Sequence, residues 1–121
     1  MTTLRLRILF DDAMLGPGKA ELLERIRDTG SIAAAGRQME MSYKRAWMLV
    51  EEMNDAFHEP LVISTRGGPG GGGAQLTETG ARVLDLYHQI VATAQGAAAS
   101  RISALEALLR PAAERDMSVR K

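Results

Sequence analysis

The sequence contains no cysteine, few aromatic residues and no excess charge of either sign. Without cysteine the chain has no disulfide bond, no thiolate metal ligand and no cysteine nucleophile. Its two histidines, His58 and His88, lie far apart and do not have the spacing of a short metal-binding motif. We therefore expect no metal centre and no enzymatic activity. The alternative, a small enzyme, would need a site near one of these histidines.

Long apolar segments are also missing. None approaches the roughly 20 residues that a membrane span requires, and the N-terminus has no signal-peptide pattern. At 121 residues the chain is long enough for one domain with a modest core. We expect a cytoplasmic protein with no membrane partner, in which residues 1–110 form the domain and residues 111–121 are a disordered tail.

The charges balance, with 15 basic and 15 acidic residues. Proteins that bind nucleic acids usually carry a surplus of basic residues, so the overall charge does not favour that function. A nucleic-acid-binding hypothesis must therefore rest on where individual charges lie.

Apolar periodicity and capping residues predict the secondary structure. Ser31, Ser42 and Thr77 each precede a helical pattern and are suitable N-caps. Gly30 is a suitable C-cap. In chain order the expected elements are a strand over residues 4–10, helices over 19–29, 32–39 and 43–57, strands over 61–65 and 74–76, and a helix over 78–109.

The order of these elements predicts a winged helix-turn-helix. A tight turn at Glu40 and Met41 separates the second and third helices, as in a helix-turn-helix. Two short strands then flank the glycine-rich segment 67–73. The expected fold class is mainly α with a small β-sheet, in which one helix enters a DNA groove and a hairpin lies beside it.

The helix over residues 43–57 is the expected recognition helix. Lys44 and Arg45 lie on its exposed side in the first turn, whereas its later exposed charges are acidic. The helix dipole favours the opposite order by about 0.3–1 kcal/mol per group. Insertion of the first turns into a DNA groove explains this order, and the alternative is that the charges are simply solvated. The expected DNA contacts from this helix are Ser42, Tyr43, Lys44, Arg45, Trp47 and Met48.

Tyr43 and Trp47 lie at the edge of the buried stripe of this helix. They could be partly buried against the first strand or the wing, or they could contact the wall of the DNA groove. Ser42 is first of all an N-cap, and contact with a phosphate is a secondary role.

The glycine-rich segment is the expected wing. It lacks the Gly-Lys-[Ser/Thr] ending of a nucleotide-binding loop, and the strand and capped helix around it distinguish it from a simple linker. Its backbone, free of side chains, could approach a phosphate backbone or a minor groove closely. Further DNA contacts are expected from the second helix and the wing: Ser31, Arg37, Arg66, Gly68, Gly70 and Gly71.

The last helix, about residues 77–109, is too long to pack entirely on so small a core. Apolar residues recur along it every seven residues, although Arg101 interrupts one row. We expect a dimer in which two recognition helices lie roughly 34–36 Å apart, about one DNA turn. The alternative is a single helix lying over its own domain. The expected interface residues are Leu84, Tyr87, Val91, Ala94, Ala98 and Leu105.

Four segments resemble the N-terminal DNA-binding domain of the ModE-type, molybdenum-dependent transcriptional regulators, a LysR-like winged helix. They are Gly30-Ser31-Ile32, Ser42-Tyr43-Lys44-x-Ala46-Trp47, Glu52-Met53-Asn54 and Gly67-Gly68-x-Gly70-Gly71-Gly72-Gly73-Ala74-x-Leu76-Thr77-x-x-Gly80. The resemblance covers most of residues 15–95. Its most specific part is the Ser-Tyr-Lys-x-Ala-Trp segment followed by the glycine tract.

The resemblance implies a prokaryotic winged-helix dimer that binds operator DNA through the helix after Ser42 and through the wing. Arg45 stands where the family often has a smaller residue, and Pro69 replaces a position that can be basic. ModE regulators continue into a module that binds molybdate. The 121 residues leave no room for it, so we expect this chain to bind neither molybdate nor another cofactor.

The leading hypothesis is a cytoplasmic, nucleoid-associated transcriptional regulator without a ligand-sensing domain, which binds double-stranded DNA as a homodimer. Lys44, Arg45 and Met48 would read base edges. Arg37, Lys44 and Arg66 would contact phosphates. The alternative is an interaction module that pairs through its last helix with a full-length ModE-like regulator and modulates it, and the neutral net charge favours this alternative.

Overall fold

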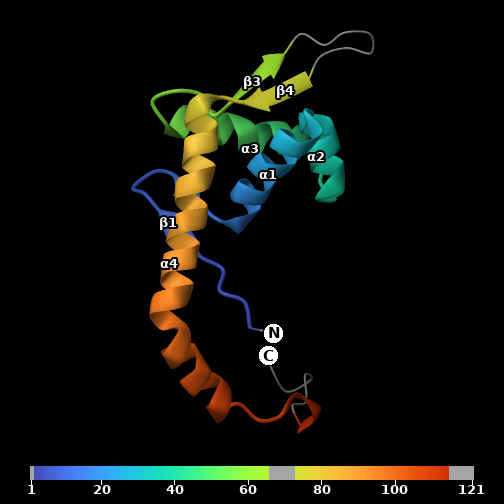
Figure 1. Cartoon of the computed structure of the whole chain (residues 1–121). Coiled ribbons are helices and arrows are strands. Elements are labelled where there is room, and N and C mark those ends of the chain that lie inside the picture. The colour runs from blue at the N-terminus through green and yellow to red at the C-terminus, as the bar shows by residue number, and fades with distance from the viewer. Residues whose placement is uncertain (1, 66–72, 115–121) are drawn as a thin grey trace. The chain divides into compact units, whose positions relative to one another are not determined.

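The structure is a computed structural model that describes residues 2–65 and 73–114. The chain divides into two compact parts, residues 1–91 and residues 92–121. The mainly helical fold class with a small β component is confirmed (Figure 1). The elements within the described residues are β1 (Ile8–Leu9), β2 (Met14–Leu15), α1 (Pro17–Thr29), α2 (Ile32–Gln38), α3 (Tyr43–Ala56), β3 (Val62–Thr65), β4 (Gly73–Leu76), α4 (Glu78–Leu108) and the 3-10 turn η1 (Ala112–Glu114).

The N-terminal strand is much shorter than the one expected over residues 4–10. Only Ile8 and Leu9 form β1, and they pair in antiparallel fashion with β2, which the sequence does not predict. A hydrogen bond of 2.8 Å from the Phe10 amide to the Ala13 carbonyl closes the turn between the strands. The alternation holds over residues 4–8, where Leu4, Leu6 and Ile8 are half-buried, but Phe10 is exposed and ends this face. Strands of two residues are too short to give a reliable periodic signal.

The first helix ends at the predicted C-cap, Gly30. α1 begins at Pro17, whose missing N–H costs nothing in the first helical turn. It ends at Gly30, which has the left-handed φ of 72° and donates its N–H to the Ile26 carbonyl at 2.8 Å. The Gly30 carbonyl accepts a hydrogen bond of 2.9 Å from the Ala74 amide. The end of α1 is therefore bonded to the base of the second hairpin.

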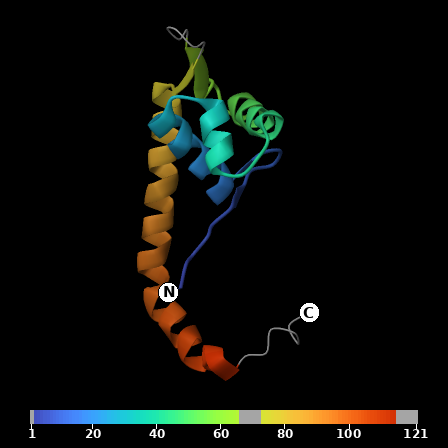
Figure 2. The same cartoon turned by 90° about the vertical axis from the view of Figure 1, so that its right-hand side faces the viewer.

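The helix-turn-helix is formed by α2 and α3. The hydroxyls of Ser31 and Ser42 accept hydrogen bonds of 3.0 and 3.1 Å from the backbone N–H three residues ahead, so both predicted N-caps are confirmed. Glu40, in the turn, has a positive φ of 57°. A Cβ at Gly36 would lie 3.0 Å from the Cβ of Ala46, so glycine allows the two helices to approach closely. The helices α1, α2 and α3 pack on one another, and β3 and β4 extend from their upper end in Figure 2.

Asn54 joins α3 to the second hairpin. Its Oδ1 accepts hydrogen bonds from the amides of Leu61 at 2.8 Å and Val62 at 3.1 Å, and its Nδ2 donates to the Val62 carbonyl at 3.1 Å. The hairpin pairs Val62 with Leu76 and Thr65 with Gly73. One polar side chain thus fixes where β3 leaves the helical core.

The start of α4 closes the core from the other side. Thr77 caps it as predicted: its Oγ1 accepts the Gly80 amide at 2.9 Å and donates to the Pro60 carbonyl at 2.7 Å. A Cβ at Gly80 would lie only 2.1 Å from the Leu61 carbonyl oxygen, so the backbones are in contact there. The buried apolar core consists of Leu15, Ala20, Leu22, Leu23, Ile26, Ile32, Ala35, Ala46, Val50, Met53, Leu61, Val62, Ala74, Leu84 and Tyr87.

In the part of the chain after Ala92, α4 continues to Leu108. A single 3-10 turn, η1, follows within the expected disordered tail, and residues 115–121 of that tail lie outside the described residues. No helix among the described residues is both long and apolar enough to cross a membrane. The domain boundary near residue 110 stays a prediction.

Candidate nucleic-acid interface

The first turns of α3 present an exposed face of the expected composition. Ser42, Tyr43, Lys44 and Arg45 are exposed, and 43% of the Met48 surface is accessible. The opposite side of the helix is buried through Ala46, Val50 and Met53. The helical spacing of the sequence therefore predicts the buried and exposed sides of this helix correctly.

Tyr43 and Trp47 lie on the side of α3 that faces the hairpin. Tyr43 is 58% exposed and Trp47 is half-buried, and their rings make an edge-to-face contact with centroids 6.2 Å apart. A cavity of about 250 Å³ separates them from the strands. Its lining residues are Ser31, Ile32, Ala33, Tyr43, Trp47, Ser64, Thr65, Gly73 and Ala74. Of the two places of burial considered, the hairpin rather than the first strand lies beside these rings.

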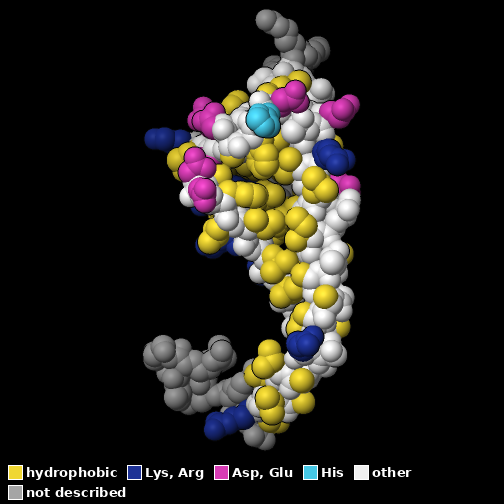
Figure 3. Space-filling view, turned by 90° about the vertical axis from the view of Figure 1, so that its left-hand side faces the viewer, with side chains coloured by type: hydrophobic (Ala, Val, Ile, Leu, Met, Phe, Trp, Pro, Cys, Tyr) yellow, Lys and Arg dark blue, Asp and Glu magenta, His cyan; other side chains and the backbone are white. Residues whose placement is uncertain are grey.

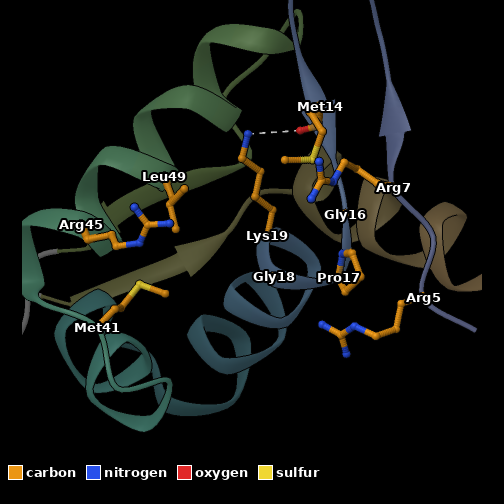
Figure 4. A pocket seen from close by; sticks show the side chains of 10 residues that line it. All are labelled: Arg5, Arg7, Met14, Gly16, Pro17, Gly18, Lys19, Met41, Arg45 and Leu49. Atoms are coloured by element: carbon orange, nitrogen blue, oxygen red, sulfur yellow. Dashed lines mark hydrogen bonds between the residues drawn. The ribbon is translucent and has the colours of Figure 1, made fainter. Parts of the chain in front are cut away.

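A second hollow lies on the other side of α3. It has a volume of about 370 Å³ and is lined by Arg5, Arg7, Met14, Gly16, Pro17, Gly18, Lys19, Met41, Arg45 and Leu49 (Figure 4). Arg45 extends into this region, together with two arginines of the N-terminal segment. The sequence alone does not indicate a function for Arg5, Arg7 or Lys19. The only pattern that involves Arg5 and Arg7 is their alternation with leucines, which predicts a strand rather than a binding site.

The charges near α3 are partly neutralised. The Nζ of Lys19 lies 3.1 Å from the Glu52 carboxylate and donates to the Met14 carbonyl, also at 3.1 Å.

Tyr87 of α4 lies beside the N-terminal segment. Burial raises the pKa of the Tyr87 phenol, while the positive charge of Arg5 lowers this pKa in part. The Tyr87 hydroxyl donates a hydrogen bond of 2.6 Å to the Leu6 carbonyl, which holds the N-terminal segment against α4.

Of the remaining predicted DNA contacts, those in α2 and its N-cap are described by the structure and those in the wing are not. Ser31 is half-buried and its hydroxyl is engaged as an N-cap, whereas Arg37 is exposed near the end of α2. The predicted wing residues Arg66, Gly68, Gly70 and Gly71 lie outside the described residues. All of these contacts stay predictions.

The predicted dimer residues differ widely in exposure. Leu84 and Tyr87 are only 3% and 4% exposed, because they fill the core of their own protomer, and Val91 is half-buried. Ala94 and Ala98 are partly accessible, and Leu105 is 65% exposed. The seven-residue spacing therefore also selected residues that pack inside the chain. Leu86 and Ile90, which this spacing does not select, have accessible apolar side chains. Hydrophobic side chains are visible along α4 in Figure 3.

From the sequence, His88 is a candidate only for a metal or catalytic site. Its Nε2 instead contacts the Glu24 carboxylate, which links α4 to α1. Among the described residues no group of three or more metal-ligating side chains comes together.

A helix-turn-helix followed by a hairpin, with cations on the first turn of its second helix, defines a winged-helix DNA-binding domain. The family model of bacterial regulatory helix-turn-helix proteins of the lysR family matches residues 18–81. Since this match covers more than half of the chain, the protein belongs to the lysR family of regulatory helix-turn-helix proteins.

Curated relatives support the resemblance to ModE regulators. The transcriptional regulator ModE of Yersinia pestis is 43% identical over 79 residues, which are 65% of this chain and 30% of that protein. The molybdenum transport protein ModE of Azotobacter vinelandii is 41% identical over 76 residues (63% and 28%). ModE of Haemophilus influenzae is 36% identical over 97 residues (79% and 38%). The matches span well under half of these relatives.

Two solved structures share the fold. The DNA-binding domain of CbnR, in a complex with DNA, has a TM-score of 0.55 at 19% identity and covers 72% of this chain and 95% of its own. The multiple antibiotic resistance repressor MarR has a TM-score of 0.57 at 16% identity, with coverage of 78% and 73%. The matched family and the curated ModE relatives are regulators, in agreement with the expectation that the chain is not an enzyme.

Proposed function

We propose that this protein is a sequence-specific transcriptional regulator that binds double-stranded DNA as a dimer. The observation that carries the proposal is the exposed first turn of α3, where Lys44 and Arg45 are cationic and solvent-accessible although the helix dipole opposes them. The membership of the lysR family and the identity to ModE regulators support the same function.

The recognition role belongs to the N-terminal half of α3. Lys44, Arg45 and Met48 would read base edges in the major groove, since arginine and lysine pair well with guanine and an apolar side chain suits a thymine methyl group. The later charges of α3 are acidic and would remain in solvent. Arg37, Arg66 and the wing backbone would contact phosphates and fix the register of the protein on the duplex.

A second copy would pair along α4. In support, Leu86 and Ile90 are 41% and 45% exposed within one compact part of the chain, and Leu105 is 65% exposed in the other. Covering such residues stabilises association by roughly 25 cal/mol per Å² of buried apolar surface. The proposal assigns no molybdenum ligand to the chain.

Selection of bound sequences from a random DNA pool, followed by fluorescence anisotropy at two salt concentrations, tests the proposal. A palindromic sequence that retains its preference at the higher salt concentration is the expected result. Weak binding of all sequences that disappears with salt would contradict base reading.

A matched pair of charge variants locates the interface. Lys44→Gln should weaken binding to the selected sequence. Arg27→Gln removes the same charge from an exposed α1 residue paired with Asp28 at 3.0 Å, and should leave binding nearly unchanged. Equal effects of both substitutions would contradict the placement of DNA along α3.

A further inference from the structure

The hollow beside α3 is lined by cations from three parts of the chain that are distant in sequence. Arg5 and Arg7 come from the N-terminal segment, Lys19 from the first turns of α1 and Arg45 from the first turn of α3. In Figure 4 the side chains of Arg7 and Arg45 lie on opposite sides of Lys19, and Arg5 lies below them. None of the described residues that line the hollow is acidic.

Three of these four cations have no acidic partner in the part of the chain that the structure describes. Lys19 is neutralised by Glu52 at 3.1 Å. Within residues 2–65 and 73–114, no carboxylate lies within 4.0 Å of the guanidinium groups of Arg5, Arg7 or Arg45. A chain without net charge therefore places three arginines that have no carboxylate partner among the described residues around one concave surface. Guanidinium groups bind carboxylates and phosphates through paired hydrogen bonds.

The hollow also has an apolar surface. Met14, Met41 and Leu49 are half-buried and line it beside the backbone of Gly18. Its volume of about 370 Å³ is within the range of sites for small molecules, which combine apolar walls with a few charged groups. This combination fits a small anion with an apolar body.

We propose that this hollow is a binding site for a small organic anion, whose phosphate or carboxylate group is held by Arg5, Arg7 and Arg45 and whose apolar part contacts Met14, Met41 and Leu49. Arg45 also belongs to the first turn of α3, so a bound anion would hold its guanidinium group away from DNA. This coupling rests on the proposed DNA-binding function, whereas the site itself does not.

Titration of the full chain with phenyl phosphate, followed by amide chemical shifts and by calorimetry without DNA, tests the site. We expect saturable binding, with shifts around Arg7, Gly18 and Arg45, and no comparable binding of uncharged phenol. Arg7→Gln keeps the side-chain stem that lies against Gly16 and should weaken binding at least about tenfold.

Gly18 offers a matched pair of variants. A Cβ at this position meets no atom within 4 Å, so a side chain is accommodated there without displacing others. Gly18→Glu adds a carboxylate at the hollow and should weaken phenyl phosphate binding at least about tenfold. Gly18→Gln, of nearly equal size, should change it much less. Equal effects of both variants would overturn the electrostatic role of the arginines.

Three outcomes test the site and the proposed function separately. The proposal would be overturned if the folded protein shows no saturable binding of phenyl phosphate while Arg7→Gln weakens DNA binding. The hollow would then be part of the DNA-binding surface. Binding of phenyl phosphate that competes with the selected DNA supports both the site and the coupling. Binding by a protein that has no affinity for any DNA sequence would support the site and contradict the proposed function.

Discussion

A single amide, Asn54, satisfies three backbone groups of the segment that enters β3. It illustrates how individual residues hold the recognition helix and the hairpin in one arrangement. Buried backbone groups that lose a partner cost about 1–3 kcal/mol, so the contribution of such a residue exceeds that of an ordinary surface contact.

Asn54→Ala should therefore lower the free energy of unfolding by about 2–3 kcal/mol, because the amides of Leu61 and Val62 lose their acceptor. Urea denaturation measures this change. Asn54→Asp retains the acceptor oxygen and should cost less. A loss below about 0.5 kcal/mol in the alanine variant would contradict this role.

Two glycines of α4 form a second comparison. Gly80→Ala places a methyl group 2.1 Å from the Leu61 carbonyl oxygen, so the backbone must move, and we expect a loss of about 1–3 kcal/mol or more. Gly96→Ala meets no atom within 4 Å and should be neutral or stabilise by up to about 1 kcal/mol. Thermal denaturation of both variants checks the prediction, and equal stabilities would contradict it.

Base reading by Arg45 is testable on DNA. If Arg45 contacts a guanine, Arg45→Ala should cost about 1–3 kcal/mol on the selected sequence and much less on a scrambled one. Anisotropy titrations with both duplexes measure the difference. An equal loss on both sequences would assign Arg45 to phosphate contact.

Ser42→Ala should lower the free energy of unfolding by about 1 kcal/mol, because α3 loses its N-cap.

At the scale of elements, the sequence predicts those that have both a periodic pattern and a cap. α1, α2 and α3 have polar or proline starts and definite ends, and their bounds agree with expectation to within about two residues. β1 and β2 lack these signals because each has only two residues. The packing partner of α4 is harder to predict. A helix that packs on its own domain shows the same apolar spacing as one that pairs with a second copy.

The two faces of α4 give a direct prediction. Ile90→Glu changes an exposed residue and should abolish dimerisation while leaving the stability of the protomer largely unchanged. Leu84→Ala empties a core position and should lower stability by about 2–4 kcal/mol. Analytical ultracentrifugation and urea denaturation separate the two effects. A dimer that persists in Ile90→Glu would exclude this part of α4 from the interface.

At the scale of the whole molecule, function depends on where charge lies rather than on its total. The face of Lys44, Arg45 and Met48 was predictable because these residues are neighbours on one helix. The basic hollow was not predictable, because Arg5 and Arg45 line it together only after β1, β2, α1 and α2 have folded between them. Sequence spacing carries no signal for such a tertiary cluster.

The base of the second hairpin has a consequence for engineering. Thr65 is paired with Gly73, Ala74 is bonded to the Gly30 carbonyl, and a Cβ at Gly73 would lie 2.7 Å from that same oxygen. The described residues on either side of segment 66–72 are therefore bonded independently of the sequence of that segment. A segment from another protein could therefore replace residues 66–72, provided that Gly73 is kept. Variants with new DNA preferences could then be selected without changing the rest of the domain.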